Sequence, residues 1–453
     1  MTSIDTIVAL ASATGRGAVG VIRVSGPSVP QIAESIIGNL PPPRLAQVAH
    51  FLAGDGEWLD QGLALYFPAP ASYTGEHVLE LQGHGGVLVL DSLLKRLIEL
   101  GCRMARPGEF SERAFLNGKI DIAQAEAIAD LIDAGSAAAA RAAVRSMQGE
   151  FSARVHELQA QITELRTLVE AAIDFPDEEL DFVPGSVLGD RIAKIFMSFD
   201  AITAAARQGA LLREGLNVVI AGKPNAGKSS LLNKLVGDEI AIVSEHPGTT
   251  RDVLRQQVHL DGLTLNLIDT AGLRKAADVV EAEGVRRALA ELSRADRVLY
   301  ILDAAAPLPK SSASDLAAEL LELPKGVPVT LIFNKIDLSG AQANIDESRD
   351  PPQVFLSART GAGLDLLRAH LKNRAGFISG DSGAFSARRR HLDALDRAKA
   401  CVVQAAEVLT GTRAFELFAE ELRRAQLALG EITGEFSSDD LLGQIFSSFC
   451  IGK

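Results

Sequence analysis

Apolar residues recur along the chain with different periods, and each change of period marks a new zone. Up to about residue 118, short apolar and β-branched runs alternate with turn residues, a pattern typical of strands joined by tight turns. The predicted strands are Thr6–Leu10, Val19–Val24, Leu63–Phe67 and Val78–Leu81, and one helix is predicted over Val87–Leu100. We therefore expect an α+β domain over residues 1–118.

The next zone, residues 119–215, has the period of helices instead. Apolar positions from Phe151 to Ala172 are spaced alternately by four and three residues, which predicts a seam for helix-on-helix packing. Two similar stripes lie within residues 377–453, from Leu392 to Ala405 and from Phe415 to Leu429. Because amphipathic faces must be buried against other helices, we predict that the two zones pack together as one helical domain.

Residues 216–376 lie between these helical zones and alternate apolar strands with helix-like stretches. This alternation is typical of an α/β domain built on a parallel sheet. The predicted fold class is therefore multi-domain, with an α+β N-terminal domain, an all-α helical bundle, and an α/β domain inserted into the bundle. A change of state in an inserted domain can act on both of its connections.

The inserted zone begins with a phosphate-binding motif. Residues 222–229, Gly-Lys-Pro-Asn-Ala-Gly-Lys-Ser, fit the P-loop pattern GxxxxGK[ST] between an apolar run and a helix-like stretch. Glycines let the backbone wrap an anion, and the following helix adds the positive end of its dipole. Lys228 is expected to reach the β- and γ-phosphates, and Ser229 to bind Mg²⁺. The residues assigned to this loop are Asn225, Ala226, Gly227, Lys228, Ser229 and Ser230.

Four later motifs indicate which nucleotide is bound. A DxxG motif at 269–272 places an Asp near the metal and a Gly N–H near the γ-phosphate. An NKxD motif at 334–337 places a carboxylate against the donor pair of guanine, its N1–H and its exocyclic amine. Adenine lacks that donor pair, so the sequence predicts GTP. The DxxG residues are Asp269, Thr270, Ala271 and Gly272, and the guanine-binding residues are Asn334, Lys335 and Asp337, with Ser357, Ala358 and Arg359 at the guanine oxygen. Thr249 and Thr250 lie between the phosphate loop and DxxG, where a switch-I threonine completes the Mg²⁺ shell.

Composition narrows the class of protein. A length of 453 residues is enough for about three domains, and a net charge of −13 means that any nucleic acid must bind a local patch. The three cysteines have neither CxxC nor metal-binding spacing, which suits a reducing cytoplasm. We see no signal peptide and no apolar run near the ~20 residues of a membrane span, so no membrane association is expected.

Long segments outside these motifs resemble the MnmE (TrmE) family of tRNA-modification GTPases, and the resemblance covers essentially the whole chain. The matching segments are 15–17, 21–26, 73–76, 80–86, 105–115, 119–132 and 449–453. The resemblance implies an N-terminal folate-binding and dimerisation domain over 1–118, a helical domain over 119–215 and 377–453, and an inserted G domain over 216–376.

The resemblance also implies partners and a reaction. Members of this family form homodimers and assemble with the FAD-containing protein MnmG as a heterotetramer. Together they build an aminomethyl or carboxymethylaminomethyl group on carbon 5 of the wobble uridine of certain tRNAs. The one-carbon unit comes from a tetrahydrofolate derivative in its 5-formyl or methylene form.

The folate site of the family falls on Arg23, Glu80, Lys119 and Lys453. Cations suit the anionic glutamate tail of a folate, and a carboxylate suits the donor edge of its pterin. Without the resemblance, Arg23 or Glu80 alone is more simply a surface charge. Because Lys453 is the last residue, its place in this site requires the C-terminal segment to dock on the first domain.

Hydrolysis needs a group that orients water. A Ras-like protein would have Gln directly after DxxG, but this chain has Leu273, which cannot hydrogen-bond to water. The resemblance implies that Glu281 orients the water and that K⁺ replaces an arginine finger by supplying positive charge near the transferred phosphate. It assigns Glu281, Thr250 and Lys228 to catalysis; Ser229 and Thr250 to Mg²⁺; and Asn225, Ser244, His246 and Thr249 to K⁺.

Two other functions are compatible with parts of this sequence. One is a ribosome-assembly GTPase switch of the Era or Der kind, although we find no KH domain with its GXXG clamp, no second G domain and no basic tail. The other is a folate-dependent methyl-transfer enzyme that carries an added G domain. The three functions differ in what they change in cellular tRNA.

Overall fold

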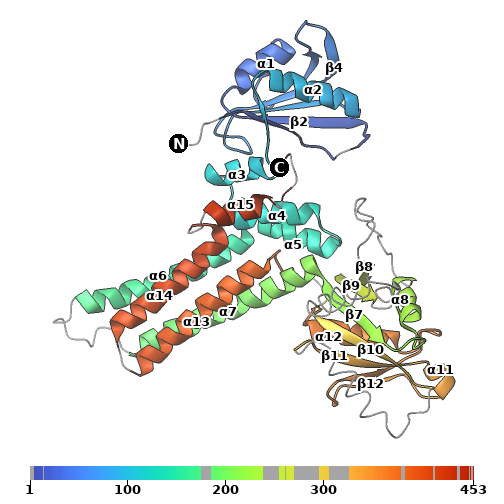
Figure 1. The fold of residues 1–453 in the computed structure, drawn as a ribbon. Coiled ribbons are helices and arrows are strands. Elements are labelled where there is room, and N and C mark those ends of the chain that lie inside the picture. Colours follow the sequence, from blue (N-terminus) through green and yellow to red (C-terminus); the bar gives the residue numbers. More distant parts are fainter. Residues whose placement is uncertain are drawn as a thin grey trace, which may run out of the picture. The chain divides into compact units, whose positions relative to one another are not determined.

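The computed structural model describes residues 5–13, 15–174, 185–237, 255–260, 262–269, 295–305, 326–378, 383–411, 414–435, 439–447, 449 and 452. The chain divides into two compact units (Figure 1). Unit 1 contains residues 1–132, 144–200 and 393–453, and unit 2 contains residues 133–143 and 201–392. The two ends of the sequence therefore belong to the same unit.

Unit 1 begins with a six-stranded sheet in the order β3-β4-β5-β2-β1-β6. Helices α1 and α2 cover one face (Figure 1), where Ile22 and Leu81 are fully buried. Side chains alternate between the two faces of a strand, so Arg23 and Glu80 point to the face opposite these helices. The elements are β1 Ile7–Leu10, β2 Val19–Ser25, α1 Val29–Ile37, β3 Gln47–Leu52, β4 Trp58–Phe67, β5 Val78–His84, α2 Val87–Glu99 and β6 Arg103–Met104.

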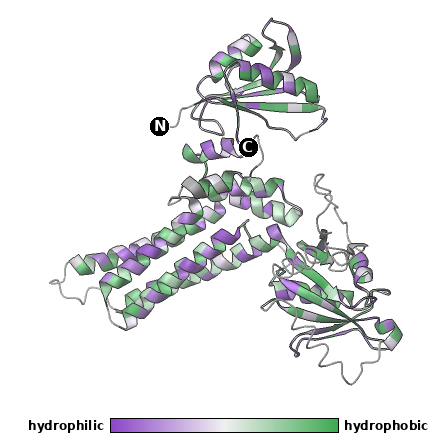
Figure 2. Cartoon of the chain, in the orientation of Figure 1, coloured by the Kyte–Doolittle hydropathy of each residue, from purple (hydrophilic) through white to green (hydrophobic). Residues whose placement is uncertain are grey.

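The helices that follow contain the seams expected from the sequence. Helices α6 and α14 pack along each other, and their seam positions from Phe151 to Val169 and from Phe418 to Leu429 are at most 1% exposed. Figure 2 shows apolar residues alternating with polar ones along these helices. The elements are α3 Glu109–Leu116, α4 Ile122–Ile132, α5 Ala137–Met147, α6 Glu150–Asp174, α7 Gly185–Glu214, α13 Arg389–Thr410, α14 Phe415–Thr433 and α15 Asp439–Ser447.

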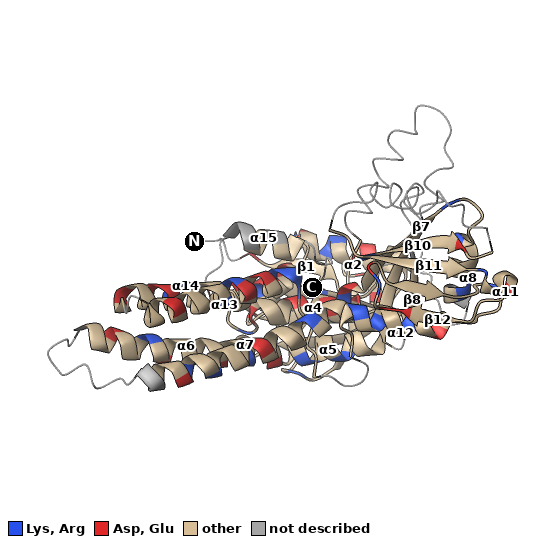
Figure 3. Cartoon of the chain, turned by 90° about the horizontal axis from the view of Figure 1, so that it is seen from below, with Lys and Arg blue, Asp and Glu red and all other residues tan. Residues whose placement is uncertain are grey.

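Charged residues of both signs are interspersed along the long helices (Figure 3). Several form ion pairs one helical turn apart, such as Arg423 with Glu420 at 2.8 Å, and others link helices, such as Lys399 with Asp200 at 2.6 Å. Exposed pairs of this kind contribute little stability. The described part of the bundle therefore depends on its apolar seams.

Unit 2 is built on a seven-stranded sheet in the order β12-β13-β11-β10-β7-β9-β8. The five inner strands run parallel, and the edge strands β12 and β8 pair antiparallel. Parallel strands bring their carboxyl ends to one edge of a sheet, where α/β proteins bind ligands. The elements are β7 Leu216–Gly222, α8 Lys228–Gly237, β8 Arg255–Leu260, β9 Leu263–Asp269, β10 Arg297–Asp303, β11 Val329–Asn334, α11 Ile336–Ser339, β12 Asn344–Asp346, β13 Gln353–Phe355 and α12 Leu364–Ala375.

The predicted strands and the helix of the first zone are all present, but the sequence pattern missed several elements. It missed helices α1 and α3, strands β3 and β6, and the first half of β4. None of the described helices is long and apolar enough to cross a lipid bilayer.

Candidate functional site

The phosphate loop joins the end of β7 to the start of α8. Gly222, Asn225 and Gly227 have φ values of 138°, 63° and 100°, a conformation that glycine and asparagine tolerate best. Lys228 Nζ donates to the carbonyl oxygens of Gly222 at 2.9 Å and Lys223 at 2.8 Å. The loop is thus wound around a buried ammonium group, which places it to meet the phosphates of a nucleotide.

Asn334, at the end of β11, ties this loop to the others. Its Nδ2 donates to the carbonyl oxygen of Ala226 at 2.9 Å, and its Oδ1 accepts from the backbone N–H of Ala358 at 2.9 Å. An added Cβ at Gly227 would lie 2.1 Å from Asn334 Nδ2, so the backbone approaches too closely for any side chain there. Three motifs that are far apart in the sequence therefore meet at one buried side chain.

The proposed base-recognition residues lie beside this junction. Asp337 Oδ1 accepts a hydrogen bond from Ser357 Oγ at 2.6 Å, and Arg359 lies 4.0 Å from its other oxygen. Lys335 has φ 68° and pairs with Asp303 at the end of β10 at 2.6 Å. The Asp337 carboxylate is thus held in a fixed orientation at the carboxyl edge of the sheet.

Asn225, Ser229 and Ser230 are exposed at the phosphate loop, and Asp269 ends β9 with its backbone paired to Ile220 of β7. The structure therefore places the backbone of Asp269, the first residue of DxxG, beside the strand that leads into the phosphate loop. The remaining predicted nucleotide and metal residues lie outside the described residues: Ser244, His246, Thr249, Thr250, Thr270, Ala271, Gly272 and Glu281, together with the side chain of Asp269.

In unit 1 the structure brings Arg23 and Glu80 together on adjacent strands. They are register partners on β2 and β5, and Arg23 Nε and Nη2 both lie 2.9 Å from Glu80 Oε1. The guanidinium also lies 5.5 Å from the ring centroid of Tyr73 and 5.8 Å from that of Phe110. Aromatic faces attract a cation in this way. Glu80 and the two rings therefore hold the Arg23 guanidinium in a fixed position on this face of the sheet.

Lys119 reaches the loop between β4 and β5 that carries Tyr73. Its Nζ donates to the carbonyl oxygen of Pro70 at 3.1 Å, and Tyr73 Oη lies 2.8 Å from Ser111 Oγ on α3. Tyr73 and Phe110 are site neighbours that the sequence pattern did not single out. The signal was present in the long segments that match the family, because each aromatic residue lies within one of them.

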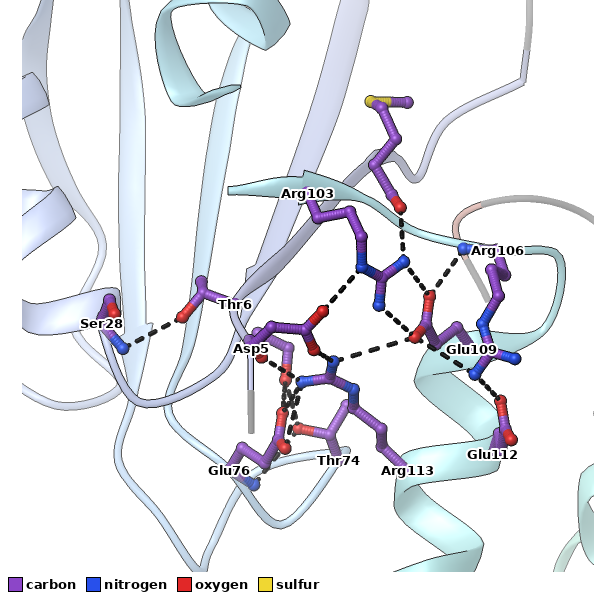
Figure 4. Close-up of polar contacts among 12 residues, drawn as sticks. Asp5, Thr6, Ser28, Thr74, Glu76, Arg103, Arg106, Glu109, Glu112 and Arg113 are labelled. Carbon is purple, nitrogen blue, oxygen red and sulfur yellow. Dashed lines mark hydrogen bonds and ion pairs between the residues drawn. The ribbon is translucent and has the colours of Figure 1, made fainter. Parts of the chain in front are cut away.

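An ion-pair network fixes the segments around the Arg23–Glu80 pair (Figure 4). Arg113 of α3 donates to Asp5 at 2.6 Å and to Glu76 at 2.9 Å, and Arg103 of β6 donates to Asp5 and to Glu109, both at 2.6 Å. The hydrogen bond from Arg103 holds the pKa of Asp5 below its ordinary value. The network therefore ties α3 to the loop before β5, and each of these two segments carries an aromatic ring near the guanidinium of Arg23.

The C-terminal segment lies against the first sheet. An added Cβ at Gly452 would be 2.2 Å from the carbonyl oxygen of Leu10, and one at Gly108 would be 2.6 Å from the carbonyl oxygen of Phe446 in α15. Lys453 itself lies outside the described residues. Gly452 packs against the end of β1, in the same sheet as Arg23 and Glu80.

One further pair lies at the end of β5, and the sequence did not reveal it. His84 Nδ1 lies 2.7 Å from Asp60 Oδ1, and its backbone N–H donates to Asp60 Oδ2, also at 2.7 Å. The two residues are 24 positions apart and come from different strands. Among the described residues, no group of three or more His, Cys, Asp or Glu is arranged to hold a metal ion.

Comparison with known proteins identifies related chains. The family model "MnmE helical domain" matches residues 122–450, and the model "GTP-binding protein TrmE N-terminus" matches residues 6–119. The crystal structure of the G domain of the T. maritima FeoB iron transporter is 30% identical and covers 35% of this chain and 98% of its own, with a TM-score of 0.27. The family assignment does not depend on that low score.

Full-length relatives decide the assignment. A "tRNA modification GTPase MnmE" from Methylococcus capsulatus is 56% identical over 449 residues, which cover 99% of each chain. Proteins of the same name from Sodalis glossinidius and Yersinia pseudotuberculosis are 57% and 56% identical and cover 100% of each chain. With this identity along its whole length, the chain belongs to the MnmE family of tRNA modification GTPases.

Proposed function

We propose that this GTPase is activated by K⁺ and works with the flavoprotein MnmG to modify wobble uridine in tRNA. It installs an aminomethyl or carboxymethylaminomethyl group on carbon 5 and takes the one-carbon unit from a tetrahydrofolate derivative. The observation that carries the folate assignment is the Arg23–Glu80 pair, whose guanidinium lies near the rings of Tyr73 and Phe110. The reaction requires tRNA and the partner protein, so we assign the chain to the cytoplasm.

The unit 1 site has the chemistry that a reduced folate requires. A folate has a flat pterin with a donor edge and an anionic glutamate tail. Glu80 can accept from the pterin, whereas Arg23, Lys119 and Lys453 provide cations for the tail. The partly exposed ring of Tyr73 beside the guanidinium can supply a surface for the ring system of the ligand, whereas Phe110 is fully buried.

We also propose the three-part organisation and a homodimer formed by the N-terminal domain. The domains are 1–118, 119–215 with 377–453, and the G domain 216–376. The sheet face opposite α1 and α2 exposes three apolar side chains, Val19 at 60%, Val48 at 65% and Leu63 at 38%. Exposed apolar residues grouped on one sheet face favour burial by a second protein surface.

The nucleotide site offers oxygen ligands, which suit hard cations. Ser229 and Thr250 are the proposed Mg²⁺ ligands, and Asn225, Ser244, His246 and Thr249 are the proposed K⁺ ligands. We infer that His246 contributes its backbone carbonyl oxygen. When bound, K⁺ would place positive charge where negative charge gathers in the transition state.

Replacing Na⁺ with K⁺ will raise kcat for GTP hydrolysis by at least about tenfold, because a cation at the developing charge lowers the barrier by ~1.4 kcal/mol or more. Hydrolysis rates in matched K⁺, Na⁺ and Rb⁺ buffers test this. The Asn225→Gly variant will lose the K⁺ response but still bind GTP through Lys228. Glycine removes the side-chain oxygen and keeps the left-handed backbone at this position unstrained.

Asn233→Ala is the matched control, since Asn233 is exposed on α8, outside the phosphate loop. This variant will keep the full response to K⁺. Equal turnover of the wild-type protein in K⁺ and Na⁺ would rule out the proposed activation. A K⁺ response that survives in Asn225→Gly would remove Asn225 from the ion's ligands.

A further inference from the structure

We propose that the β8–β9 hairpin transmits the state of the nucleotide site to the helices that continue from unit 2 into unit 1. One end of this hairpin leads into the segments that the sequence assigns to the nucleotide and its metal ions. The other end packs against helix α5, the end of α7 and the segment after α12. This connection regulates the GTPase, a role beyond the proposed function.

The hairpin lies between two nucleotide segments of the sequence. Strand β8 follows the predicted switch-I threonines, and β9 ends at Asp269, the first residue of DxxG. The two strands are paired along their whole length, up to Leu260 with Leu263. Both of these leucines, together with Leu265 and Leu267 of β9, are buried in the core of unit 2. Because a packed interior is stiff, a shift at the nucleotide end of the hairpin moves its far end.

The far end of the hairpin lies beside α5 and Phe377. An added Cβ at Gly262, in the turn between the strands, would lie 3.6 Å from Phe377 Cζ and 3.7 Å from Ala138 Cβ. An added Cβ at Gly135, just before α5, would lie 3.6 Å from His259 Cε1. A single methyl group would therefore just fill the space between the hairpin turn and α5.

Phe377 joins two apolar clusters. It packs against the core of unit 2 and also against the cluster between α5, α7 and the segment after α12. The buried members of the second cluster are Ala139, Ala142, Leu212 and Ala384. Gln208 of α7 holds the backbone on both sides of Phe377, because its Nε2 donates to the carbonyl oxygen of Gly376 and its Oε1 accepts from the N–H of Ile378 at 3.1 Å. A displacement of this ring therefore acts on α7 as well as on α5.

Strand β9 also contacts the end of α7 directly. Asn266 Nδ2 donates to the carbonyl oxygen of Glu214, the last residue of α7, at 2.8 Å. An added Cβ at the next residue, Gly215, would lie 2.6 Å from the carbonyl oxygen of Thr264. Gly215 also has φ 72°, so close packing and backbone conformation both favour glycine there. The hairpin is thus packed against the junction at which α7 passes into β7.

Three helices continue from unit 2 into unit 1. The boundaries between the units, which lie between residues 143 and 144, 200 and 201, and 392 and 393, fall inside α5, α7 and α13. The hairpin contacts α5 and α7 on the unit 2 side of these boundaries. Because a helix is a stiff element, a shift of its unit 2 end also displaces the part in unit 1. Coupling of this kind is reciprocal, so whatever fixes the helices must alter the preference of the site between GTP and GDP.

Hydrogen exchange of the full-length wild-type protein tests the coupling without any substitution. Amide exchange in α5 and in residues 201–214 of α7 will differ at least about fivefold between the complexes with GDP and with a non-hydrolysable GTP analogue, the lower end of the usual range for coupled sites. Exchange in α1, on the N-terminal sheet, will be the same in both complexes and is the internal control. Equal exchange in α5 and α7 with the two nucleotides would overturn the inference.

A reversible cross-link tests the reciprocal effect. The separation of 3.7 Å at Ala138 and Gly262 matches the Cβ spacing of a disulfide, which is about 3.8 Å. In the double variant Ala138→Cys with Gly262→Cys, oxidation will change the ratio of the affinities for GDP and the GTP analogue at least about fivefold, and reduction will reverse the change. The two single-cysteine variants, treated in the same way, will show no change on oxidation. The Gly262→Cys variant also accounts for the strain of a side chain at φ 99°.

An oxidised double variant with the same affinity ratio as its reduced form would contradict the coupling. Failure of the disulfide to form in the folded protein would contradict it too, because the hairpin turn and α5 would then not lie together. If Gly262→Cys prevents folding, the exchange measurement on the wild-type protein decides alone. Neither measurement uses tRNA, folate or the flavoprotein partner, so failure of the proposed modification reaction would leave this result unaffected.

Discussion

Replacing Glu281 with alanine will lower kcat for GTP hydrolysis by roughly 10²–10⁴, the range expected for a group that orients or deprotonates the attacking water. Leu273 follows the DxxG motif and has no polar atom, so the water must be oriented by another side chain. The carboxylate of Glu281 can do this directly or through a second water. GTP affinity will change by less than about twofold, because the group contacts water and not the nucleotide.

Glu283→Ala is the matched control for this experiment, since Glu283 is two residues away in the same segment. Single-turnover hydrolysis and nucleotide titration are measured for both variants and for the wild-type protein. The control will hydrolyse GTP at the wild-type rate. A normal single-turnover rate in Glu281→Ala, or a loss that is entirely in binding, would refute the role of Glu281.

Deleting Gly452 and Lys453 will weaken binding of 5-formyltetrahydrofolate by roughly 10–100-fold, the range for losing a charge-assisted hydrogen bond. The same deletion will abolish tRNA modification. The physical reason is that Gly452, which directly precedes the terminal cation, packs against Leu10 in the sheet that carries Arg23 and Glu80. Calorimetric titration of the folate into the wild-type and truncated proteins measures the first effect.

Two substitutions of Lys453 distinguish the effect of its charge from the effect of packing the C-terminal residues against the sheet. Lys453→Arg keeps the cation and will retain folate binding, and Lys453→Ala removes the cation while Gly452 stays in place. GTP hydrolysis by the truncated protein will be unchanged, since the nucleotide residues all lie within 216–376. Folate affinity that is unaffected by the truncation would remove Lys453 from the site.

The parts of the fold that could be predicted are those with strong local periodicity. The helical seams depend on spacings of three and four residues, and their positions are buried as expected except at the seam ends Ala172, Leu392 and Phe415, which are partly buried. The first half of β4 was missed because it contains Asp60 and Gly62, which are unfavourable in strands. The structure explains Gly62, because an added Cβ there would lie 2.1 Å from the carbonyl oxygen of Gln82 on β5.

The same distinction between local and long-range signals applies to the candidate binding sites. The phosphate loop and the guanine motifs are short, contiguous and placed after strands, so the sequence locates them directly. The Arg23–Glu80 pair spans 57 residues, and only the resemblance indicated it in advance. The Asp60–His84 pair follows from strand register, because β4 and β5 must pair correctly before the two side chains can meet. Neither residue type nor local spacing carries that information.

The most direct measurement of the central claim is the nucleoside composition of tRNA from a strain that lacks this chain. We expect the carboxymethylaminomethyl group to disappear from wobble uridine, and we expect it to return when the wild-type chain is supplied. The GTP-hydrolysis variant Glu281→Ala and the truncation at Gly452 should each fail to restore it. Normal wobble uridine in the deletion strain, with defective ribosome assembly or loss of a methylated nucleoside instead, would contradict the proposed function.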